Sequence, residues 1–173
     1  MTKQILLFFA LLLPSYGYAS EELALKTIKT YAKSLKKELK AGLKKSPQEA
    51  IKICQIKAPQ LQAESNLKNL KIGRVSLKNR NPKNTPRAWM KDYIQQFHNQ
   101  KITKSHIVVS LDRHTKGLLK PIVTVPLCLK CHGSHLSEQV SKEIKKRYPQ
   151  DKATGYKVGE IRGFFWAEYT EKD

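Results

Sequence analysis

The stretch Cys128-Leu129-Lys130-Cys131-His132 governs how the rest of the chain is interpreted. Its C-x-x-C-H spacing is the attachment signature of a c-type haem. Two thiols three positions apart can each add to one vinyl group along one edge of the porphyrin. A histidine directly after the second thiol is then held under the iron as the proximal ligand. Cys128, Cys131 and His132 are therefore the predicted cofactor-binding residues, and one covalently attached haem c is the predicted cofactor.

Two other kinds of site share the C-x-x-C spacing. A zinc site needs four ligands, and the sequence holds no second C-x-x-C and no H-x-H cluster. A redox-active thiol pair is expected near a βαβ pattern, which the sequence does not show. A chance C-x-x-C-H in a chain of this length is roughly a one-in-a-thousand event, so haem attachment is the favoured interpretation.

Covalent haem attachment takes place outside the bacterial inner membrane, so this interpretation requires export. Lys3 supplies a positive start, Ile5 to Leu13 is an unbroken apolar run of nine residues, and Gly17-Tyr18-Ala19 is a small-x-small cleavage pattern. The run is too short to span a bilayer. We expect residues 1–19 to be a signal peptide cleaved after Ala19, and residues 20–173 to form a single periplasmic domain without an integral membrane segment.

The formal net charge is +19 at pH 7, and loss of Lys3 with the signal peptide would make it +18. Such a charge is common in nucleic-acid-binding proteins, but an exported haem protein meets little nucleic acid, so none is expected as a partner. The lysines are spread along the whole chain, which favours a solvated surface. An acidic redox or signalling partner protein and an anionic membrane surface remain open as alternatives.

The first part of the mature chain predicts two helices. Apolar residues recur at three- and four-residue steps from Glu21 to about Lys45, with lysines on the other face. Ser46 can cap a second helix, Pro47 suits its first position and Glu49 can complete a capping box. Pro59 is expected to break or kink this second helix. The two helices are predicted to form an antiparallel N-terminal hairpin.

The remaining segments alternate between strand-like and helix-like patterns, so the predicted fold class is α+β. Arg80 to Pro86 is rich in proline and asparagine and is predicted to be a loop. The expected elements are a strand over Leu70–Leu77, a helix opening at Pro86, a hairpin of Ile107–Leu111 and Ile122–Val125 joined by Asp112–Lys120, a helix over Ser137–Arg147, and a final strand pair of Tyr156–Ile161 and Gly163–Tyr169.

Four stretches together are similar to a known family. They are Ala50-Ile51-Lys52-Ile53-Cys54 with Ala58-Pro59; Ile72-Gly73-Arg74-Val75-Ser76-Leu77 with Arg80-Asn81-Pro82-Lys83-Asn84 and Trp89; Cys128-Leu129-Lys130-Cys131-His132-Gly133; and Tyr148-Pro149, Asp151, Ala153, Gly155-Tyr156 and Gly159-Glu160-Ile161-Arg162-Gly163. In this order they resemble a bacterial family of small exported haem-c domains with a PAS-like core, formerly a domain of unknown function. The resemblance covers nearly the whole mature chain.

The resemblance implies a PAS-like antiparallel sheet with an N-terminal helical hairpin and inserted helices. It also implies that the haem iron has His132 as its proximal ligand and Cys54, on an early helix, as its distal ligand. The cysteine count agrees, because two of the three cysteines belong to the haem motif and leave Cys54 without a disulfide partner. The residues alone leave open that Cys54 is a buried structural cysteine.

Other residues could supply the distal ligand. Met90 would give the His/Met pair of ordinary electron-carrying cytochromes, and His98, His106 or His114 would give a bis-histidine pair. A solitary histidine is more often a surface residue than a ligand. His135 follows His132 too closely to reach the opposite face of the haem.

A Cys/His-ligated haem suggests redox or gas sensing, because a thiolate lowers the haem potential and can leave the iron on reduction, which would open a site for CO or NO. The alternative is a small soluble electron-transfer cytochrome. An enzyme such as a peroxidase is not expected, because it needs an open sixth position. Arg74, Arg80 and Arg162 are candidates to neutralise the haem carboxylates.

Overall fold

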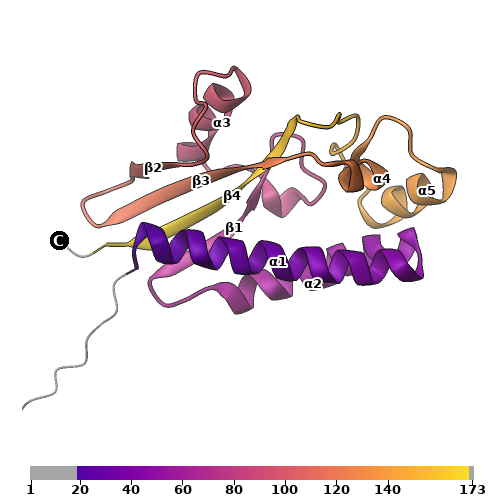
Figure 1. Cartoon of the computed structure of the whole chain (residues 1–173), viewed down its shortest axis with the longest axis horizontal. Coiled ribbons are helices and arrows are strands. Elements are labelled where there is room, and N and C mark those ends of the chain that lie inside the picture. Colours follow the sequence, from indigo (N-terminus) through magenta and orange to yellow (C-terminus); the bar gives the residue numbers. More distant parts are fainter. Residues whose placement is uncertain (1–18, 172–173) are drawn as a thin grey trace, which may run out of the picture.

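A four-stranded antiparallel sheet separates two helical layers in the computed structural model, which describes residues 19–171. The helical hairpin lies along one face of the sheet and a short helix lies against the other, while two more helices lie beyond one end (Figure 1). The strands, in their order across the sheet, are β1 (Leu70–Val75), β4 (Ile161–Thr170), β3 (Thr115–Val123) and β2 (Ile107–Ser110). The helices are α1 (Glu21–Lys45), α2 (Pro47–Ser65), α3 (Lys91–His98), α4 (Leu129–His132) and α5 (Glu138–Arg147).

One residue, Ser46, connects the two helices of the predicted hairpin. Its backbone N–H donates to the Gly42 carbonyl (3.0 Å) and ends α1, while its hydroxyl accepts the Glu49 N–H (3.1 Å) and caps α2. A Cβ at Gly42 would lie 2.7 Å from the Ala50 Cα, so this tight connection requires a glycine. The sequence therefore predicted the hairpin and its cap correctly.

Pro59 was predicted to break or kink the second helix, and the structure excludes the break, because α2 runs from Pro47 to Ser65 with Pro59 inside it. Proline removes one helical hydrogen bond, but tertiary contacts hold the surrounding turn. Ala58 is buried, and the Tyr31 hydroxyl of α1 donates to its carbonyl (3.5 Å). The packing of α2 along α1 thus outweighs the local effect of proline.

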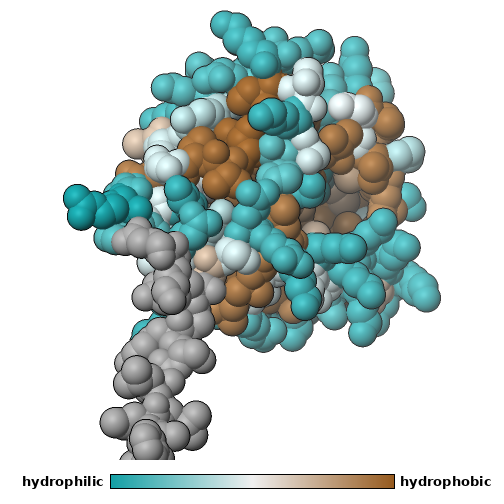
Figure 2. Space-filling view, turned by 60° about the vertical axis from the view of Figure 1, so that its left-hand side comes forward, coloured by the Kyte–Doolittle hydropathy of each residue, from teal (hydrophilic) through white to brown (hydrophobic). Residues whose placement is uncertain are grey.

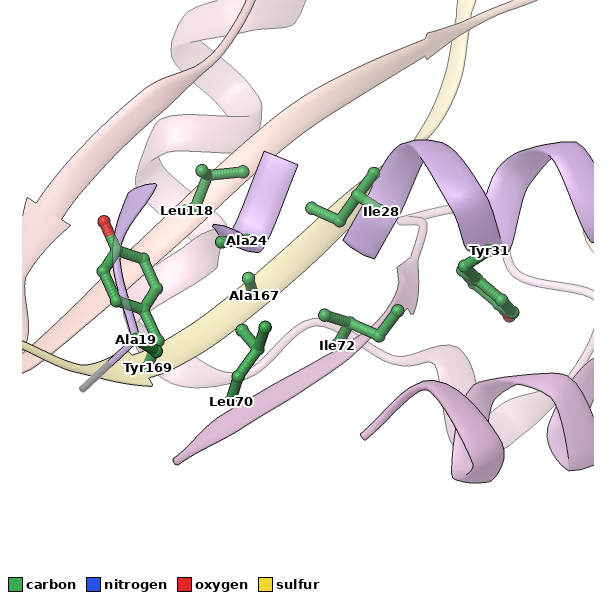
Figure 3. Packing of buried hydrophobic residues seen from close by; sticks show 9 residues of the cluster. All are labelled: Ala19, Ala24, Ile28, Tyr31, Leu70, Ile72, Leu118, Ala167 and Tyr169. Carbon is green, nitrogen blue, oxygen red and sulfur yellow. The ribbon is translucent and has the colours of Figure 1, made fainter. Parts of the chain in front are cut away.

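Alternate residues of the strands face opposite layers, as expected for a two-sided sheet. Figure 3 shows the cluster between the sheet and the helical hairpin, in which Ile28 and Tyr31 of α1 meet Ile72 of β1 and Ala167 of β4. The cluster on the other face joins α3 to the sheet. Its buried members are Val75, Met90, Ile94, Phe97, Leu119, Phe164 and Trp166.

The predicted final strand pair is wrong. Residues 151–160 form no strand, and Ile161 to Thr170 is the single strand β4, which pairs with both β1 and β3. Gly155 and Gly159 have φ values of 77° and 89°, which a regular strand does not allow. The Tyr156 N–H donates instead to the His132 carbonyl (2.9 Å), so this segment packs beside α4.

Two other boundaries also differ from the prediction. The connection between β2 and β3 was expected over Asp112–Lys120, but β3 already begins at Thr115, so the connection is shorter. The Asp112 carboxylate accepts the His114 and Thr115 N–H groups (2.8 Å each) and so closes this tight turn. The helix expected at Pro86 begins at Lys91, after a 3₁₀ turn over Ala88–Met90. Within residues 19–171, no helix is both long and apolar enough to cross a membrane.

Candidate functional site

The predicted haem-attachment motif, Cys128 to His132, lies just after β3. A 3₁₀ turn (Pro126–Cys128) leads into α4, so Cys128 and Cys131 are three residues apart on one helical path. Residues at this spacing share one side of a helix. Both thiols are free and half-buried, and Cys128 is anchored by its N–H, which donates to the Val125 carbonyl (2.8 Å).

His132, the last residue of α4, has a fixed orientation. Its Nδ1 lies 2.7 Å from the Ala153 carbonyl oxygen. Because a carbonyl only accepts, Nδ1 carries the hydrogen, and Nε2 is the nitrogen suited to bind a metal. Burial, and then the positive charges of Arg80 and Arg162, lower the pKa of His132 from 6.5 to about 3. The imidazole therefore stays neutral at physiological pH, as a metal ligand must.

Cys54 lies on α2, a different element, yet it belongs to the same region. The charge of its thiolate would act on Cys131 of α4 and on Tyr148, which follows α5. Burial raises the pKa of Cys54, while Arg74, Arg80 and Arg162 oppose that rise. The same three arginines act on His132. The fold thus brings Cys54 and His132 to one site with a shared set of positive charges.

A β-bulge directs Arg162 into this site. The β3–β4 register passes from Ile122 opposite Gly163 to Val123 opposite Ile161, which leaves Arg162 as an extra residue. In regular alternation Ile161 would face the helical hairpin, as Phe165 does. Ile161 packs instead with the α3 cluster, and the charge of Arg162 acts on Cys54 and His132.

The three arginines differ in their partners. Arg80 donates to both oxygens of Asp151 (3.0 and 3.2 Å) and to the carbonyls of Cys131 (2.6 Å) and Ala153 (3.3 Å). Among residues 19–171, by contrast, the buried Nε atoms of Arg74 and Arg162 have no hydrogen-bond partner. Buried guanidinium donors are normally satisfied by acceptors, carboxylates above all. An anionic group in this site would satisfy them, so the donor set fits the two carboxylates of a haem.

A hollow of about 280 Å³ opens beside Gln55, the residue that follows Cys54 in α2. The Tyr148 ring, 9 % exposed, forms one side, and burial raises the pKa of its hydroxyl to about 12. Arg147 bonds to Glu143 and Gln55 at the rim. The lining residues are Gln55, Arg80, Asn81, Pro82, Arg147, Tyr148, Pro149 and Gln150.

The other ligand candidates lie elsewhere. Met90 is fully buried in the α3 cluster, on the opposite face of the sheet from the helical hairpin, and His98 packs edge-on to Phe164 of that cluster. His106 bonds through Nε2 to the Glu21 carboxylate (2.8 Å). His114 lies in the β2–β3 turn. Within the described part of the chain, no three His, Cys, Asp or Glu residues are grouped to hold a metal ion.

The whole domain, with its site, can be compared with known proteins. The model of the Tll0287-like family matches residues 18–168. The chain belongs to the Tll0287-like family. A solved structure, that of the cyanobacterial heme-protein Tll0287, is similar with a TM-score of 0.66 and 22 % identity, over 90 % of this chain and 99 % of that chain. The α+β fold with its PAS-like sheet and N-terminal helical hairpin is therefore confirmed. No curated protein matches the chain.

Sequence reasoning gave Asp151 and Ala153 no role in the site. Their only sequence signal was their place in the last stretch that carried the family resemblance. Ala153 acts through its backbone carbonyl, which every residue has, and Asp151 acts through Arg80, which is 71 positions away in the sequence. Tyr31 and Tyr148 were missed as neighbours of Cys54 for the same reason: only the fold brings them there.

Proposed function

We propose that this protein binds one haem c covalently through Cys128 and Cys131, with His132 and Cys54 as the axial ligands of the iron. The observation that carries the proposal is the pairing of an oriented, neutral imidazole with a thiol from another helix in one arginine-lined site. The likeness to a structure described as a heme-protein supports the same cofactor. A haem bound here would supply reversible one-electron chemistry and a site for diatomic gases.

The residues of the site have separable tasks in this proposal. The Ala153 carbonyl keeps His132 in the tautomer that presents Nε2. Arg74 and Arg162, whose Nε atoms have no described partner, would bind the haem carboxylates. Cys54 would give up its proton on binding iron, and the three arginines favour its thiolate.

The role proposed for this site is redox or gas sensing. A thiolate binds ferric iron better than ferrous iron, so Cys54 would be released on reduction and α2 would lose one of its attachments. The released position would then accept CO or NO. A helix whose attachment depends on the iron oxidation state is a two-state element from which a partner protein could take a signal.

Electron transfer is the second candidate, and the net charge of +19 is the observation that favours it. A basic protein meets an acidic redox partner by electrostatically steered encounters. Neither candidate is an enzyme, because His132 and Cys54 would fill both ligand positions of the ferric iron. For both we propose a periplasmic location after cleavage behind Ala19, and N-terminal sequencing of the exported protein should give Ser20 as the first residue.

The test of ligation is Cys54→Ala in a host with cytochrome maturation machinery. The variant should keep the mass of one covalent haem, because Cys128 and Cys131 hold it, and lose the low-spin thiolate signature of the ferric protein. Met90→Leu, the matched control for a rival ligand, should leave that spectrum unchanged. An unchanged spectrum in Cys54→Ala would make Cys54 a structural residue.

Two further measurements complete the test. Changing both Cys128 and Cys131 to alanine should abolish covalent haem, and its retention would refute attachment at the motif. A redox titration with coordination spectra then separates the two roles. A change of ligands on reduction together with CO or NO binding supports sensing, whereas unchanged ligands in both oxidation states support electron transfer.

A further inference from the structure

Arg80 makes hydrogen bonds to Asp151 and to two backbone carbonyls of the site. It lies in the loop after β1, and its side chain is 13 % exposed, against 10 % for its partner Asp151. The pair is bidentate, with Nε to Oδ1 at 3.0 Å and Nη2 to Oδ2 at 3.2 Å. Such a fork holds a guanidinium in a fixed orientation.

From that orientation Arg80 reaches two backbone carbonyls of the haem site. Nη2 donates to the carbonyl of Cys131 (2.6 Å), directly before His132, and to the carbonyl of Ala153 (3.3 Å). The Ala153 carbonyl is also the acceptor for His132 Nδ1 (2.7 Å), and the Ala153 N–H donates to Asp151 (3.0 Å). These bonds form a closed ring that includes the predicted proximal ligand.

We infer that Arg80 and Asp151 form a positioning pair that sets the strength of His132 as an iron ligand. The inference rests on the proposed function. Arg80 shares the Ala153 carbonyl with the imidazole N–H and so weakens that carbonyl as an acceptor. A weaker acceptor leaves less negative charge on the imidazole, and the buried guanidinium adds a positive charge near the iron. Both effects disfavour ferric relative to ferrous iron. The carboxylate of Asp151 reduces them, because it is the counter-charge of Arg80.

The pair therefore predicts shifts of opposite sign in the midpoint potential. Arg80→Gln should shift the ferric–ferrous equilibrium about tenfold toward ferric, which is about 59 mV lower for a one-electron couple. Asp151→Asn leaves Arg80 without its counter-charge and should move the potential upward. In each titration one electron passes from the electrode to the iron, and His132 keeps its hydrogen bond.

Two variants separate charge from position. Arg80→Lys keeps the charge but loses the fork, so the potential should stay within threefold of the wild-type equilibrium while the iron–histidine stretch in the ferrous Raman spectrum shifts. Arg87→Gln removes a different and more exposed ion pair, that of Arg87 with Glu168, on the α3 side of the sheet. That control should move neither the potential nor the stretch.

The outcomes distinguish this inference from the proposed function. A wild-type protein without covalent haem refutes the proposed function itself. If the wild type has covalent haem, potential shifts of the same sign in Arg80→Gln and Asp151→Asn overturn the inference. Failure of both variants to mature while Arg87→Gln matures also counts against it, because the pair would then serve only to hold the fold together.

Discussion

At the level of single residues, His132 illustrates how burial keeps a proposed iron ligand neutral. The fold lowers its pKa from 6.5 to about 3, chiefly by burial and then by the charges of Arg80 and Arg162. Because the folded state disfavours protonation of this imidazole, the free energy of unfolding depends on pH. Between these two pKa values the unfolded chain binds a proton at His132 and the folded chain does not.

The free energy of unfolding should therefore fall as the pH decreases from about 6.5 toward about 3 and be fully present above that window. Urea unfolding of the haem-free Cys128→Ala/Cys131→Ala variant at several pH values measures this slope. Adding His132→Gln should flatten it. An equal slope with and without His132 would show that the imidazole is accessible to protons in the folded chain.

Arg74 and Arg162 provide the second prediction at this scale. Their Nε atoms are buried and have no partner among the described residues, whereas the Nε of Arg80 donates to Asp151. If they bind the haem carboxylates, Arg74→Gln or Arg162→Gln should shift the iron about tenfold toward ferric, or about 59 mV lower. Arg113→Gln, an exposed arginine in the β2–β3 turn, is the control. Unchanged potentials in both site variants would assign these arginines a purely structural role.

At the level of elements, the connection at Ser46 sets the start of the helix that carries Cys54. Because Ser46 satisfies an N–H at the start of α2, Ser46→Ala should lower the free energy of unfolding by about 1 kcal/mol. Denaturant unfolding measures the loss. Ser141→Ala, at an exposed interior position of α5, should stay within about 0.5 kcal/mol of the wild type. An equal loss in both variants would contradict the assigned cap.

The elements also show where sequence reasoning succeeds and where it fails. Local rules predicted the hairpin, because capping at Ser46 and the apolar spacing of α1 act within a few residues. They did not settle between a break and a kink at Pro59, where contact with Tyr31 stabilises a turn that proline weakens and the helix continues. They failed at Tyr156, whose segment resembles a strand by composition but bonds to α4.

The candidate site shows the same division. Cys128, Cys131 and His132 can be predicted because the motif is contiguous. Cys54 was predicted as a ligand from the resemblance to the family, because the cysteine count alone leaves a buried structural cysteine open. The bulge at Arg162 could not be predicted from the sequence, because it depends on strand register. The role of the Ala153 carbonyl could not be predicted either, because every residue has this backbone atom. Sequence therefore identifies candidate ligands, while the fold reveals the groups that control them.

At the level of the whole molecule, an iron bound at the proposed site would join α2 to the α4–α5 end, two parts that apolar packing and the hydrogen bonds of Gln55 with Arg147 already link. Hydrophilic residues cover much of the surface in Figure 2, and the chain relies on separate apolar clusters within it. The smallest of these clusters joins Ile51 of α2 to Val140 and Ile144 of α5. A bond between Cys54 and an iron held by α4 would add a covalent attachment at the same junction.

This attachment leads to the last prediction. Cys54→Ala should speed amide hydrogen exchange in α2 and α5, because noncovalent contacts then hold α2 to the α4–α5 end, namely the Ile51 cluster and the hydrogen bonds of Gln55 with Arg147, while β1 to β4 keep their protection. Under the sensing proposal, reducing the wild-type protein should reproduce this pattern, whereas reducing Cys54→Ala should add nothing. Equal exchange in ferric and ferrous wild-type protein would favour electron transfer, because a carrier that keeps both ligands does not change its mobility when it accepts an electron. Mass spectrometry of exchanged peptides from the three regions distinguishes these outcomes.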